Sequence, residues 1–456
     1  MVEEKENNQF ELTDELIEKV EFLVSNSEDK ELRLLLNEYH HADIAEILDE
    51  LDLEDSVYVI KLLDSETTSD ILMELDEDTR EKVLKNLSAK EIAEEIEELD
   101  TDDAADMIAE LPEARQAEVI SRIEDDEHRE EITELLAYDE DTAGGLMAKE
   151  LVKVYETWTV AGCLRRIRGQ AKEVTRVHSI YVVDKEDKLI GRLSLKDLIV
   201  AKSEQKISDI SKDTVDWVNV HDDVEDVARV MSKYDLEAIP VVDDNQTLLG
   251  RITIDDILDV LKEEADKDYQ LAAGITKDVE ADDTVWELTK ARLPWLVLGL
   301  FGGLGSVFIM KGYENIMETV PSLFFYTPLI AAMAGNVGVQ SSAIIVQGLA
   351  NDNVKGSLIS RLIKEVGLSL INGFALALLV ILFGFAIGQD ATESLAIAVS
   401  MMSVIIVAAL VGTFVPIILD KRGIDPAIAT GPFITTSNDI LGIYLFFVLS
   451  GLIIGF

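Results

Sequence analysis

Cysteine is almost absent from this sequence of 456 residues, and Cys163 is its only example. A single cysteine excludes both an intramolecular disulfide framework and a metal site built from several thiolates. We therefore interpret Cys163 as a small core residue. The N-terminus, MVEEKENNQF, lacks the apolar stretch of a secretory signal peptide, so we expect the front of the chain to stay in the cytosol.

Basic residues are also scarce, since 40 Lys and Arg face 89 Asp and Glu, for a net charge of −49. The imbalance lies at the front: residues 1–140 hold 48 acidic and 12 basic residues, residues 141–292 hold 32 and 22, and residues 293–456 hold 9 and 6. Such a surface repels nucleic acid and anionic lipid and attracts cations. A halophilic surface that is simply solvated is the alternative interpretation.

Long apolar runs are confined to the region 293–456, where five stretches each approach the ~20 residues that span ~30 Å of hydrocarbon. They run approximately over 293–310, 323–349, 362–388, 395–419 and 428–456. With a cytosolic N-terminus, seven basic residues flank the inner ends and only Lys311 lies outside, as the positive-inside rule requires. The seven are Lys290, Arg292, Lys355, Arg361, Lys364, Lys421 and Arg422. Five spans place the C-terminus outside.

Polar side chains inside these spans point to function, because they are costly in hydrocarbon. The second span contains AGNVGVQSS, in which Asn336 and Gln340 lie one helical turn apart on one face. The last span contains the polar run Thr435, Thr436, Ser437, Asn438 and Asp439, and it places Asp439 near the bilayer midplane.

No basic residue lies at the depth of Asp439, so a transported cation is the simplest counter-charge. A site with one carboxylate, amides, hydroxyls and room for water suits hydrated Mg²⁺. A protonated carboxyl with a packing role is the alternative for Asp439. For Asn336 and Gln340 the alternative is hydrogen bonding between helices.

Two internal repeats organise the front. The tripeptide Glu-Leu-Asp recurs at constant spacing, at 50–52, 74–76 and 98–100, and Ile-Glu-Asp follows at 123–125. Apolar residues at helical spacing lie between these tripeptides, so we expect pairs of short helices and a small solenoid over 40–135. Asp102 and Asp106 are one helical turn apart, which favours a bridging cation.

The second repeat has two matching copies, SIYVVDKEDKLIGRLSLKDLI at 179–199 and AIPVVDDNQTLLGRITIDDIL at 238–258. Each copy predicts strand, turn, strand and the start of a helix that a hydroxyl caps. The pair resembles tandem cystathionine-β-synthase (CBS) domains, modules that often bind adenine nucleotides. We expect Gly250, Thr253 and Asp256 to contact a nucleotide, and Gly191, Ser194 and Asp197 are their counterparts in the first copy. A scaffold without ligand is the alternative.

The segment 262–292 joins this module to the first span. Its early part is charged and favours a helix, and we expect Gly274 to break that helix. An acidic helix where the soluble part meets the pore is well placed to gate.

The whole chain resembles the MgtE family of Mg²⁺ transporters. The most specific motifs are Ala-Gly-Asn-Val-Gly-Val-Gln at 334–340 and Asp425-Pro426-Ala427, Gly431-Pro432, Thr435-Thr436 and Asp439 near the C-terminus. The resemblance implies a multi-domain membrane protein with an acidic all-α superhelical N-domain (1–140), two α/β CBS domains (141–200 and 201–262), a connecting or plug helix (263–292) and a five-helix transmembrane domain (293–456). It also implies a homodimer in the cell membrane with one pore between the two membrane domains.

The resemblance carries site residues as well. In the pore, hydrated Mg²⁺ would be held by Asp439, with Asn336, Gln340, Thr435 and Asn438 nearby; Gly431 stands where some relatives have an asparagine. Cytosolic Mg²⁺ would be sensed at Asp102, Asp106, Asp223, Glu225, Asp235, Asp256, Asp259, Glu264 and Asp268, with Lys267 where another acid is expected. Generic solvation of acidic groups is the alternative for each of these residues.

Clustered carboxylates repel one another when Mg²⁺ is low, which favours an expanded form. Bound Mg²⁺ removes the repulsion and favours a closed form, so the two forms are in a two-state equilibrium. The leading hypothesis is therefore a Mg²⁺-selective, channel-like transporter that cytosolic Mg²⁺ closes, with an adenine nucleotide such as ATP as a further ligand. Alternatives are transport of Co²⁺, Ni²⁺ or another divalent ion, or a membrane-anchored sensor without transport. An enzyme is not expected, because there is no Walker-type loop, nucleophile–base pair or hydrolase histidine cluster.

Overall fold

The computed structural model describes residues 10–172, 174, 176–277, 279, 283–350 and 357–455. The chain divides into two compact units, Met1–Leu261 and Lys262–Phe456. Lys355, one of the expected flanking charges, lies outside the described residues.

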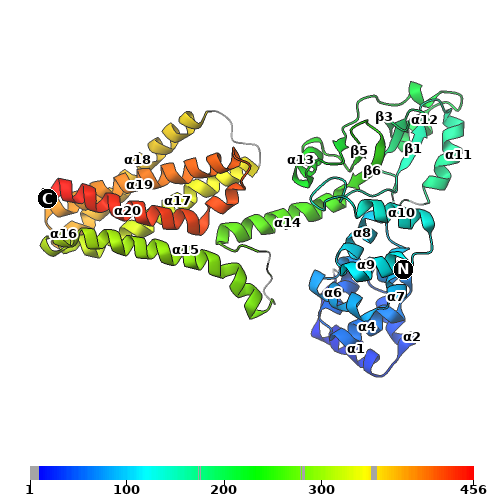
Figure 1. Cartoon of the computed structure of the whole chain (residues 1–456), viewed down its shortest axis with the longest axis horizontal. Helices are drawn as coiled ribbons and strands as arrows, with labels where there is room; N and C mark the ends of the chain where they lie inside the picture. Colours follow the sequence, from blue (N-terminus) through cyan, green and yellow to red (C-terminus); the bar gives the residue numbers. More distant parts are fainter. Residues whose placement is uncertain are drawn as a thin grey trace, which may run out of the picture. The chain divides into compact units, whose positions relative to one another are not determined.

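Short helices form the first part of the first unit, coloured blue to cyan in Figure 1. The helices α3, α5, α7 and α9 begin at residues 41, 65, 89 and 113, and each is followed by a partner helix. The predicted repeat of helix pairs is thus confirmed. The bounds are α1 Asp14–Ser25, α2 Asp29–Leu36, α3 His41–Asp49, α4 Leu53–Leu62, α5 Ser65–Glu74, α6 Glu77–Asn86, α7 Ala89–Ile96, α8 Thr101–Ala109, α9 Glu113–Ile120 and α10 Asp126–Leu135.

The repeated tripeptide has a structural role in each pair. Its apolar residue is buried in all four repeats, as Leu51, Leu75, Leu99 and Ile123. The aspartate that ends each tripeptide occupies the N-cap position of α4, α6, α8 or α10, where a negative charge favours the helix N-terminus. Helix α3 packs on α5, α5 on α7 and α7 on α9, so the pairs stack into the expected superhelix.

Two similar three-stranded sheets follow. In the first, β1 (Val152–Tyr155) is parallel to β2 (Ile180–Val183), and β2 is antiparallel to β3 (Leu189–Leu193). In the second, β4 (Val218–Asn219), β5 (Ala238–Val242) and β6 (Leu248–Thr253) repeat this order and these directions. The other elements are α11 Val160–Gln170, α12 Leu195–Val200, the 3₁₀ turn η1 Ile207–Asp209, α13 Val224–Tyr234 and α14 Ile254–Ala273.

The two copies pair with each other about a local two-fold relation. The amide of Leu189 donates to the carbonyl of Gln246 at 2.9 Å, and the equivalent amide of Leu248 donates to the carbonyl of Asp187 at 3.0 Å. Leu189 and Leu248 occupy matching positions of the two copies, and so do Asp187 and Gln246, so the two hydrogen bonds are equivalent.

The start of the predicted first CBS domain pairs with the second copy and not with the first. The amides of Ala143 and Gly144 donate to the carbonyls of Asp222 and Val220, and Ala148 forms a bridge with Arg251. One apolar core also continues from the superhelix into the second copy and includes Met147 and Ile257. The first copy has a separate core around Val154 and Ile180, so the superhelix is joined mainly to the second copy.

The second unit contains five helices whose length and composition could cross a membrane: α15 Val285–Gly312, α17 Ser322–Ala350, α18 Leu358–Ala386, α19 Ala391–Asp420 and α20 Gly431–Ile454. The number of spans predicted from the sequence is confirmed. Helix α19 packs against α17, α18 and α20, whereas α15 packs mainly on α20. Within this unit, Figure 1 shows α17–α20 side by side, with the short α16 (Glu314–Thr319) at one end of the group and the 3₁₀ turn η2 (Pro426–Ala429) leading into α20.

The predicted connecting segment 263–292 is divided between two helices. Helix α14 continues from the second copy to Ala273 and ends at Gly274, whose φ of +81° suits glycine. The break expected at Gly274 is therefore confirmed. Helix α15 already begins at Val285, two turns before the apolar stretch that we predicted from Leu293 onward.

Candidate functional sites

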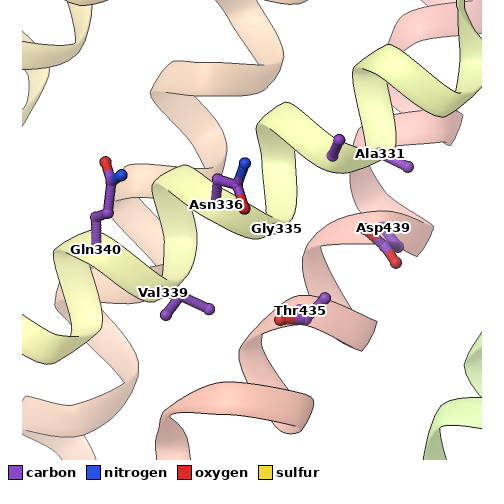
Figure 2. Close-up of a pocket in the computed structure, with 8 residues that line it drawn as sticks. Ala331, Gly335, Asn336, Val339, Gln340, Thr435 and Asp439 are labelled. Atoms are coloured by element: carbon purple, nitrogen blue, oxygen red, sulfur yellow. The ribbon is translucent and has the colours of Figure 1, made fainter.

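A groove in the second unit gathers polar side chains from α17 and α20, and we call it the Asp439 groove. Its volume is about 390 Å³. Figure 2 shows Asn336 and Gln340 on α17, and Thr435 and Asp439 on the neighbouring α20. The lining residues are Ala331, Ala332, Gly335, Asn336, Val339, Gln340, Thr435 and Asp439.

Helical spacing explains this arrangement, because side chains one turn apart lie on one face. Asn336 and Gln340 are one turn apart on α17, and Thr435 and Asp439 are one turn apart on α20. Gly335 lets the helices approach, since a Cβ there would lie 3.2 Å from Cγ2 of Thr435 and 3.7 Å from Oδ1 of Asp439. A larger residue would fill the space beside the carboxylate.

The carboxylate of Asp439 has no ion-pair or hydrogen-bond partner within the described part of the chain. Alanines, a valine and a glycine surround it together with amide and hydroxyl groups, so the groove holds one negative charge among neutral oxygen donors. This is the donor set that hard divalent cations with bound water require.

Asn438, a predicted pore residue, lies elsewhere. It is 1% exposed, and its amide faces Gly338, where a Cβ would lie only 1.8 Å from its Nδ2. Consecutive residues on a helix point about 100° apart, so Asn438 and Asp439 cannot share a face. Neither polar atom of the Asn438 side chain has a hydrogen-bond partner among the described residues.

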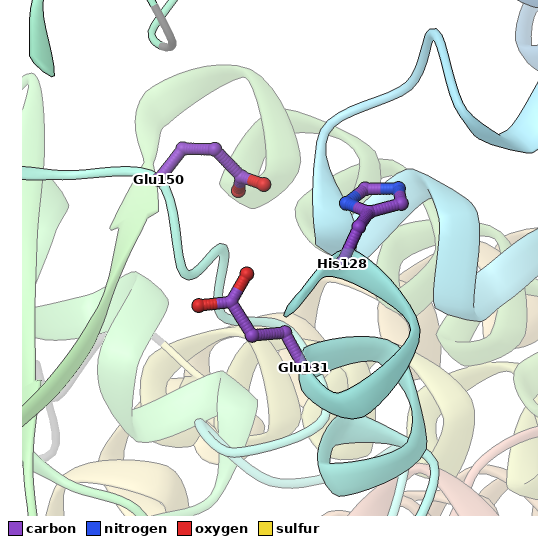
Figure 3. Close-up of side chains that lie close together, drawn as sticks. All are labelled: His128, Glu131 and Glu150. Atoms are coloured by element: carbon purple, nitrogen blue, oxygen red, sulfur yellow. The ribbon is translucent and has the colours of Figure 1, made fainter. Parts of the chain in front are cut away.

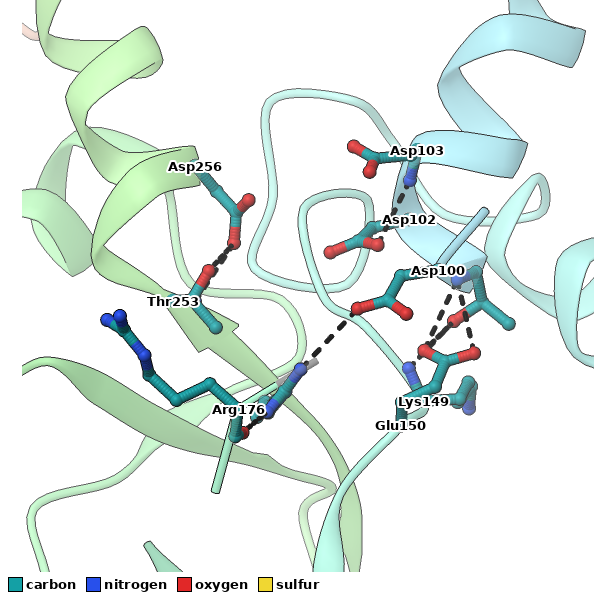
Figure 4. Close-up of polar contacts among 10 residues, drawn as sticks. Asp100, Asp102, Asp103, Lys149, Glu150, Arg176, Thr253 and Asp256 are labelled. Atoms are coloured by element: carbon teal, nitrogen blue, oxygen red, sulfur yellow. Dashed lines mark hydrogen bonds and ion pairs between the residues drawn. The ribbon is translucent and has the colours of Figure 1, made fainter. Parts of the chain in front are cut away.

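In the first unit, carboxylates converge where the first turn of α8 meets the start of α14, and we call Asp100, Asp102, Asp103, Glu150 and Asp256 the α8 acidic cluster. Oxygens of Asp100, Asp102 and Glu150 lie within 4.8 Å of one another. Figure 4 shows Asp256 across from Asp102 and Asp103, with its carboxylate accepting a hydrogen bond from the Thr253 hydroxyl at 2.6 Å. Two of the predicted sensor residues, Asp102 and Asp256, are thus brought together.

Burial and mutual repulsion make the α8 acidic cluster hold protons tightly. Burial, followed by the charge of Glu150, raises the pKa of Asp100 to about 6, although Arg251 opposes the rise. Burial, followed by the charges of Asp256 and Asp100, raises the pKa of Asp103 to about 7. The pKa of Asp102 is raised by burial and by Asp103 beside it. Among the described residues, only Arg251 forms an ion pair with a member of the cluster, at 3.6 Å from Asp100. A divalent cation would supply the missing positive charge.

The other predicted sensor residues are distributed over the two units. Asp106 lies one turn beyond Asp102, and burial, followed by the charges of Glu140 and Asp256, raises its pKa to about 7. Asp223 caps α13 by accepting from the amide of Glu225 at 2.9 Å, Asp235 ends that helix in a left-handed conformation, and Asp259 is exposed on α14. None of these three aspartates belongs to a compact group of possible metal ligands in the described residues.

Glu264 and Asp268 lie together on the part of α14 that belongs to the second unit. Lys267 forms an ion pair with Glu264 at 2.8 Å, so the basic residue found where an acid was expected neutralises its neighbour. Burial, followed by the charges of Asp425 and Glu264, raises the pKa of Asp268. Gly274 and Gly431 bring the end of α14 close to α20, because a Cβ on Gly431 would lie 2.0 Å from the carbonyl oxygen of Ala272.

The predicted nucleotide-binding residues occupy different environments in the two copies. A Cβ on Gly250 would lie 2.6 Å from the carbonyl oxygen of Ala148, and Thr253 is buried. The equivalent Ser194 caps α12 by accepting from the amide of Asp197 at 3.0 Å; Ser194 is exposed and Asp197 is half-buried. The predicted cap is present in the first copy. The Ser194 hydroxyl also donates to Asp197 at 2.7 Å, as the Thr253 hydroxyl donates to Asp256 at 2.6 Å in the second copy.

Sequence reasoning did not single out Asp100, Asp103 or Glu150. Asp100 is the last residue of a repeated tripeptide and occupies the N-cap position of a helix, and this position could have identified it as a candidate. Glu150 is distant from Asp102 in the sequence, so only the packed structure brings them together.

Models of known protein families match three parts of the chain. The family model described as a divalent cation transporter, MgtE, matches residues 327–449, the model of the MgtE intracellular N domain matches 39–141, and the CBS domain model matches 143–204 and 207–263. The magnesium transporter MgtE of Bacillus subtilis is 36% identical over 314 residues, which are 69% of this chain and 70% of the relative. That of Enterococcus faecalis is 37% identical over 318 residues, or 70% of each chain.

Solved structures resemble about half of the chain. The cytosolic domain of the Mg²⁺ channel MgtE in complex with ATP is 35% identical, with a TM-score of 0.51 over 54% of this chain and 99% of the other. The soluble part of a magnesium transporter is 32% identical, with a TM-score of 0.50 over 55% of this chain and 98% of the other.

Proposed function

This chain belongs to the MgtE family of divalent cation transporters, and we propose that it conducts Mg²⁺ across the cell membrane and is closed by cytosolic Mg²⁺. The observation that carries the proposal is the Asp439 groove. It offers one carboxylate without a counter-charge among the described residues, inside a bundle of helices apolar enough to span a membrane.

The size of the groove favours a hydrated ion. Six waters, at about 30 Å³ each, occupy roughly 180 Å³, and Mg²⁺ takes six oxygen ligands and releases its waters reluctantly. The groove, of about 390 Å³, accommodates that complex with the amides of Asn336 and Gln340 and the hydroxyl of Thr435 around it. In this proposal Asp439 attracts the ion, and the neutral oxygens accept hydrogen bonds from its waters.

For gating, the α8 acidic cluster is the proposed detector. Its buried carboxylates repel one another when ionised, and bound Mg²⁺ would remove that repulsion and draw α8 and α14 together. Because α14 continues into the second unit, where it packs near Gly431 at the start of α20, the same helix can transmit the change. We further propose that Asp106, Asp223, Glu225, Asp235, Asp259, Glu264 and Asp268 contribute weaker sites along this path.

Mg²⁺ flux into vesicles that contain the purified chain tests transport. Asp439→Asn keeps the side-chain volume and removes the charge, so we expect flux to fall at least tenfold. Glu318→Gln removes an exposed carboxylate of α16 and is the matched control, with flux unchanged. Flux through Asp439→Asn equal to that of the unchanged chain would refute the role of Asp439.

The same assay separates the alternatives. Preference for Co²⁺ over Mg²⁺ in competition would reassign the transported ion, and no flux of any divalent ion would favour a sensor without transport.

Dimer assembly, with the N-terminus and soluble unit in the cytosol and the C-terminus outside, is part of the proposal. Crosslinking and protease accessibility in oriented vesicles test it.

ATP is the proposed nucleotide ligand, because the solved cytosolic domain of a relative contains it. In this chain Asp256 belongs to the α8 acidic cluster, whereas in the first copy Ser194 is exposed and Asp197 is half-buried, so solvent reaches both. ATP binding that Asp197→Asn weakens would support a ribose contact in the first copy. Weakening only by Thr253→Val would place the nucleotide at the second copy.

A further inference from the structure

A second group of possible metal ligands lies in the first unit, beside the α8 acidic cluster but with different chemistry. It contains His128 and Glu131 on α10 and Glu150 in the segment before β1, and one ligand atom from each lies within 4.8 Å of the others. Figure 3 shows the imidazole with one nitrogen turned toward the two carboxylates. Nothing in the proposed Mg²⁺ transport or gating uses His128 or Glu131.

The imidazole is oriented by a contact outside this group. Its Nε2 lies 3.2 Å from the carbonyl oxygen of Ile96. Because a carbonyl only accepts hydrogen bonds, Nε2 carries the proton, and in the neutral ring Nδ1 then has a free lone pair. Donation of one ring N–H to a backbone carbonyl is the arrangement that orients metal-binding histidines in proteins.

The carboxylates are held in place as well. Both oxygens of Glu150 accept from the amide of Thr101 at 3.2 Å, and one also accepts from the Thr101 hydroxyl at 2.8 Å. Glu131 follows His128 at a spacing of about one turn and therefore lies on the same face of α10. Burial, followed by the charge of Glu150, raises the pKa of Glu131. The nearby Lys149 forms its ion pair with Glu134, at 2.8 Å.

We propose that His128, Glu131 and Glu150 form a binding site for a first-row transition metal ion, with Zn²⁺ as the probe of choice. One imidazole and two carboxylates suit such an ion, whereas Mg²⁺ prefers oxygen ligands alone. Zn–ligand distances of about 2.0–2.2 Å place tetrahedral ligand atoms roughly 3.4 Å apart. Ligand atoms already within 4.8 Å reach that geometry by side-chain movements of about 1 Å. Water would complete the coordination.

Glu150 connects this site to the α8 acidic cluster. Glu150 also belongs to the group formed with Asp100 and Asp102. A metal ion at His128 would neutralise charge that the α8 acidic cluster otherwise faces, so the two sites would be linked through one shared ligand.

The full chain in detergent, stripped of metal, is titrated with Zn²⁺ by calorimetry without added Mg²⁺, so that the shared ligand Glu150 stays available, and the tightest binding event is analysed. We expect one Zn²⁺ per chain. Both His128→Gln and Glu131→Gln should weaken it by at least the roughly 10- to 100-fold that loss of even an outer-shell partner causes. His41→Gln is the matched control, because His41 also lies near two carboxylates, 3.5 Å from Asp70 and 3.8 Å from Glu74. Unchanged binding in His128→Gln, or loss of binding in His41→Gln, would overturn the proposal.

A measurement on the unchanged chain does not depend on how the variants fold. Zn²⁺ should protect His128 from modification by diethyl pyrocarbonate, followed by peptide mass spectrometry, while His41 is labelled equally with and without the metal. Equal labelling of His128 in both conditions would overturn the proposal, and selective protection would support it.

Discussion

Removing divalent cations should make the stability of the first unit depend on pH, and the α8 acidic cluster sets the sign. The pKa of Asp100 is raised to about 6 and that of Asp103 to about 7, from an ordinary value of 3.8, so the folded state binds these protons more tightly than the unfolded state. This contribution to stability is complete below about pH 4 and is lost as the pH rises through 6 and 7.

The magnitude follows from about 1.36 kcal/mol for each pH unit over which one group binds its proton only in the folded state. Between pH 5 and 8, Asp100 gives about 1.4 and Asp103 about 2.7 kcal/mol. Both groups are partly exposed, so solvent screening reduces the combined loss to about 2 kcal/mol. Bound Mg²⁺ stabilises the ionised carboxylates and should remove most of this loss.

Urea unfolding of residues 1–261, followed by Trp158 and Trp217 fluorescence with either chelator or excess Mg²⁺, provides the assay. The solved soluble parts of relatives support the use of this fragment. Asp103→Asn should reduce the slope of the pH profile in chelator, and the remainder comes from the other buried acids, such as Asp100 and Asp106. Glu54→Gln, at an exposed acid on α4, should leave the profile unchanged. Stability that rises from pH 5 to 8 in chelator, or the same slope in Asp103→Asn, would refute the reasoning.

Three further perturbations test the packing. Gly431→Ala places a Cβ 2.0 Å from the carbonyl oxygen of Ala272, at a residue whose backbone conformation is strained for alanine. The end of α14 should therefore separate from α20, and Mg²⁺ flux at high cytosolic Mg²⁺ should rise. Unchanged inhibition of flux would count against transmission through α14. Gly338→Ala drives a Cβ into the Asn438 amide, and we expect a lower thermal inactivation temperature in detergent, with an unshifted temperature as the contrary result. Ile92→Ala empties a fully buried position in the superhelix and should cost about 2–5 kcal/mol in urea unfolding, while a loss below about 1 kcal/mol would contradict the packing.

Features that repeat locally could be predicted from the sequence. The regular spacing of the Glu-Leu-Asp tripeptides predicted the helix pairs, because one buried apolar residue and one N-cap aspartate recur in each. The second repeat predicted two matching strand–turn–strand copies, and apolar length predicted five spans. Helical periodicity also placed Asn336 with Gln340 on one face, since spacing along a helix fixes direction without tertiary information.

Which neighbouring element a side chain faces could be learned only from the tertiary structure. Asn438 and Asp439 are adjacent and both polar, yet only packing against Gly338 decides that Asn438 is buried while Asp439 lines the groove. Likewise, residues 142–148 precede the first copy in the chain but pair with the second.

The sequence by itself thus determined the repeats, the spans and the acidic character of the front, because each depends on side chains close together in the chain. The tertiary structure alone decided which acids meet. Asp100, Glu150 and Asp256 are far apart in the chain and approach only when α8, the segment before β1 and α14 fold against one another. Charge repulsion opposes that approach, and burial of the surrounding apolar core maintains it.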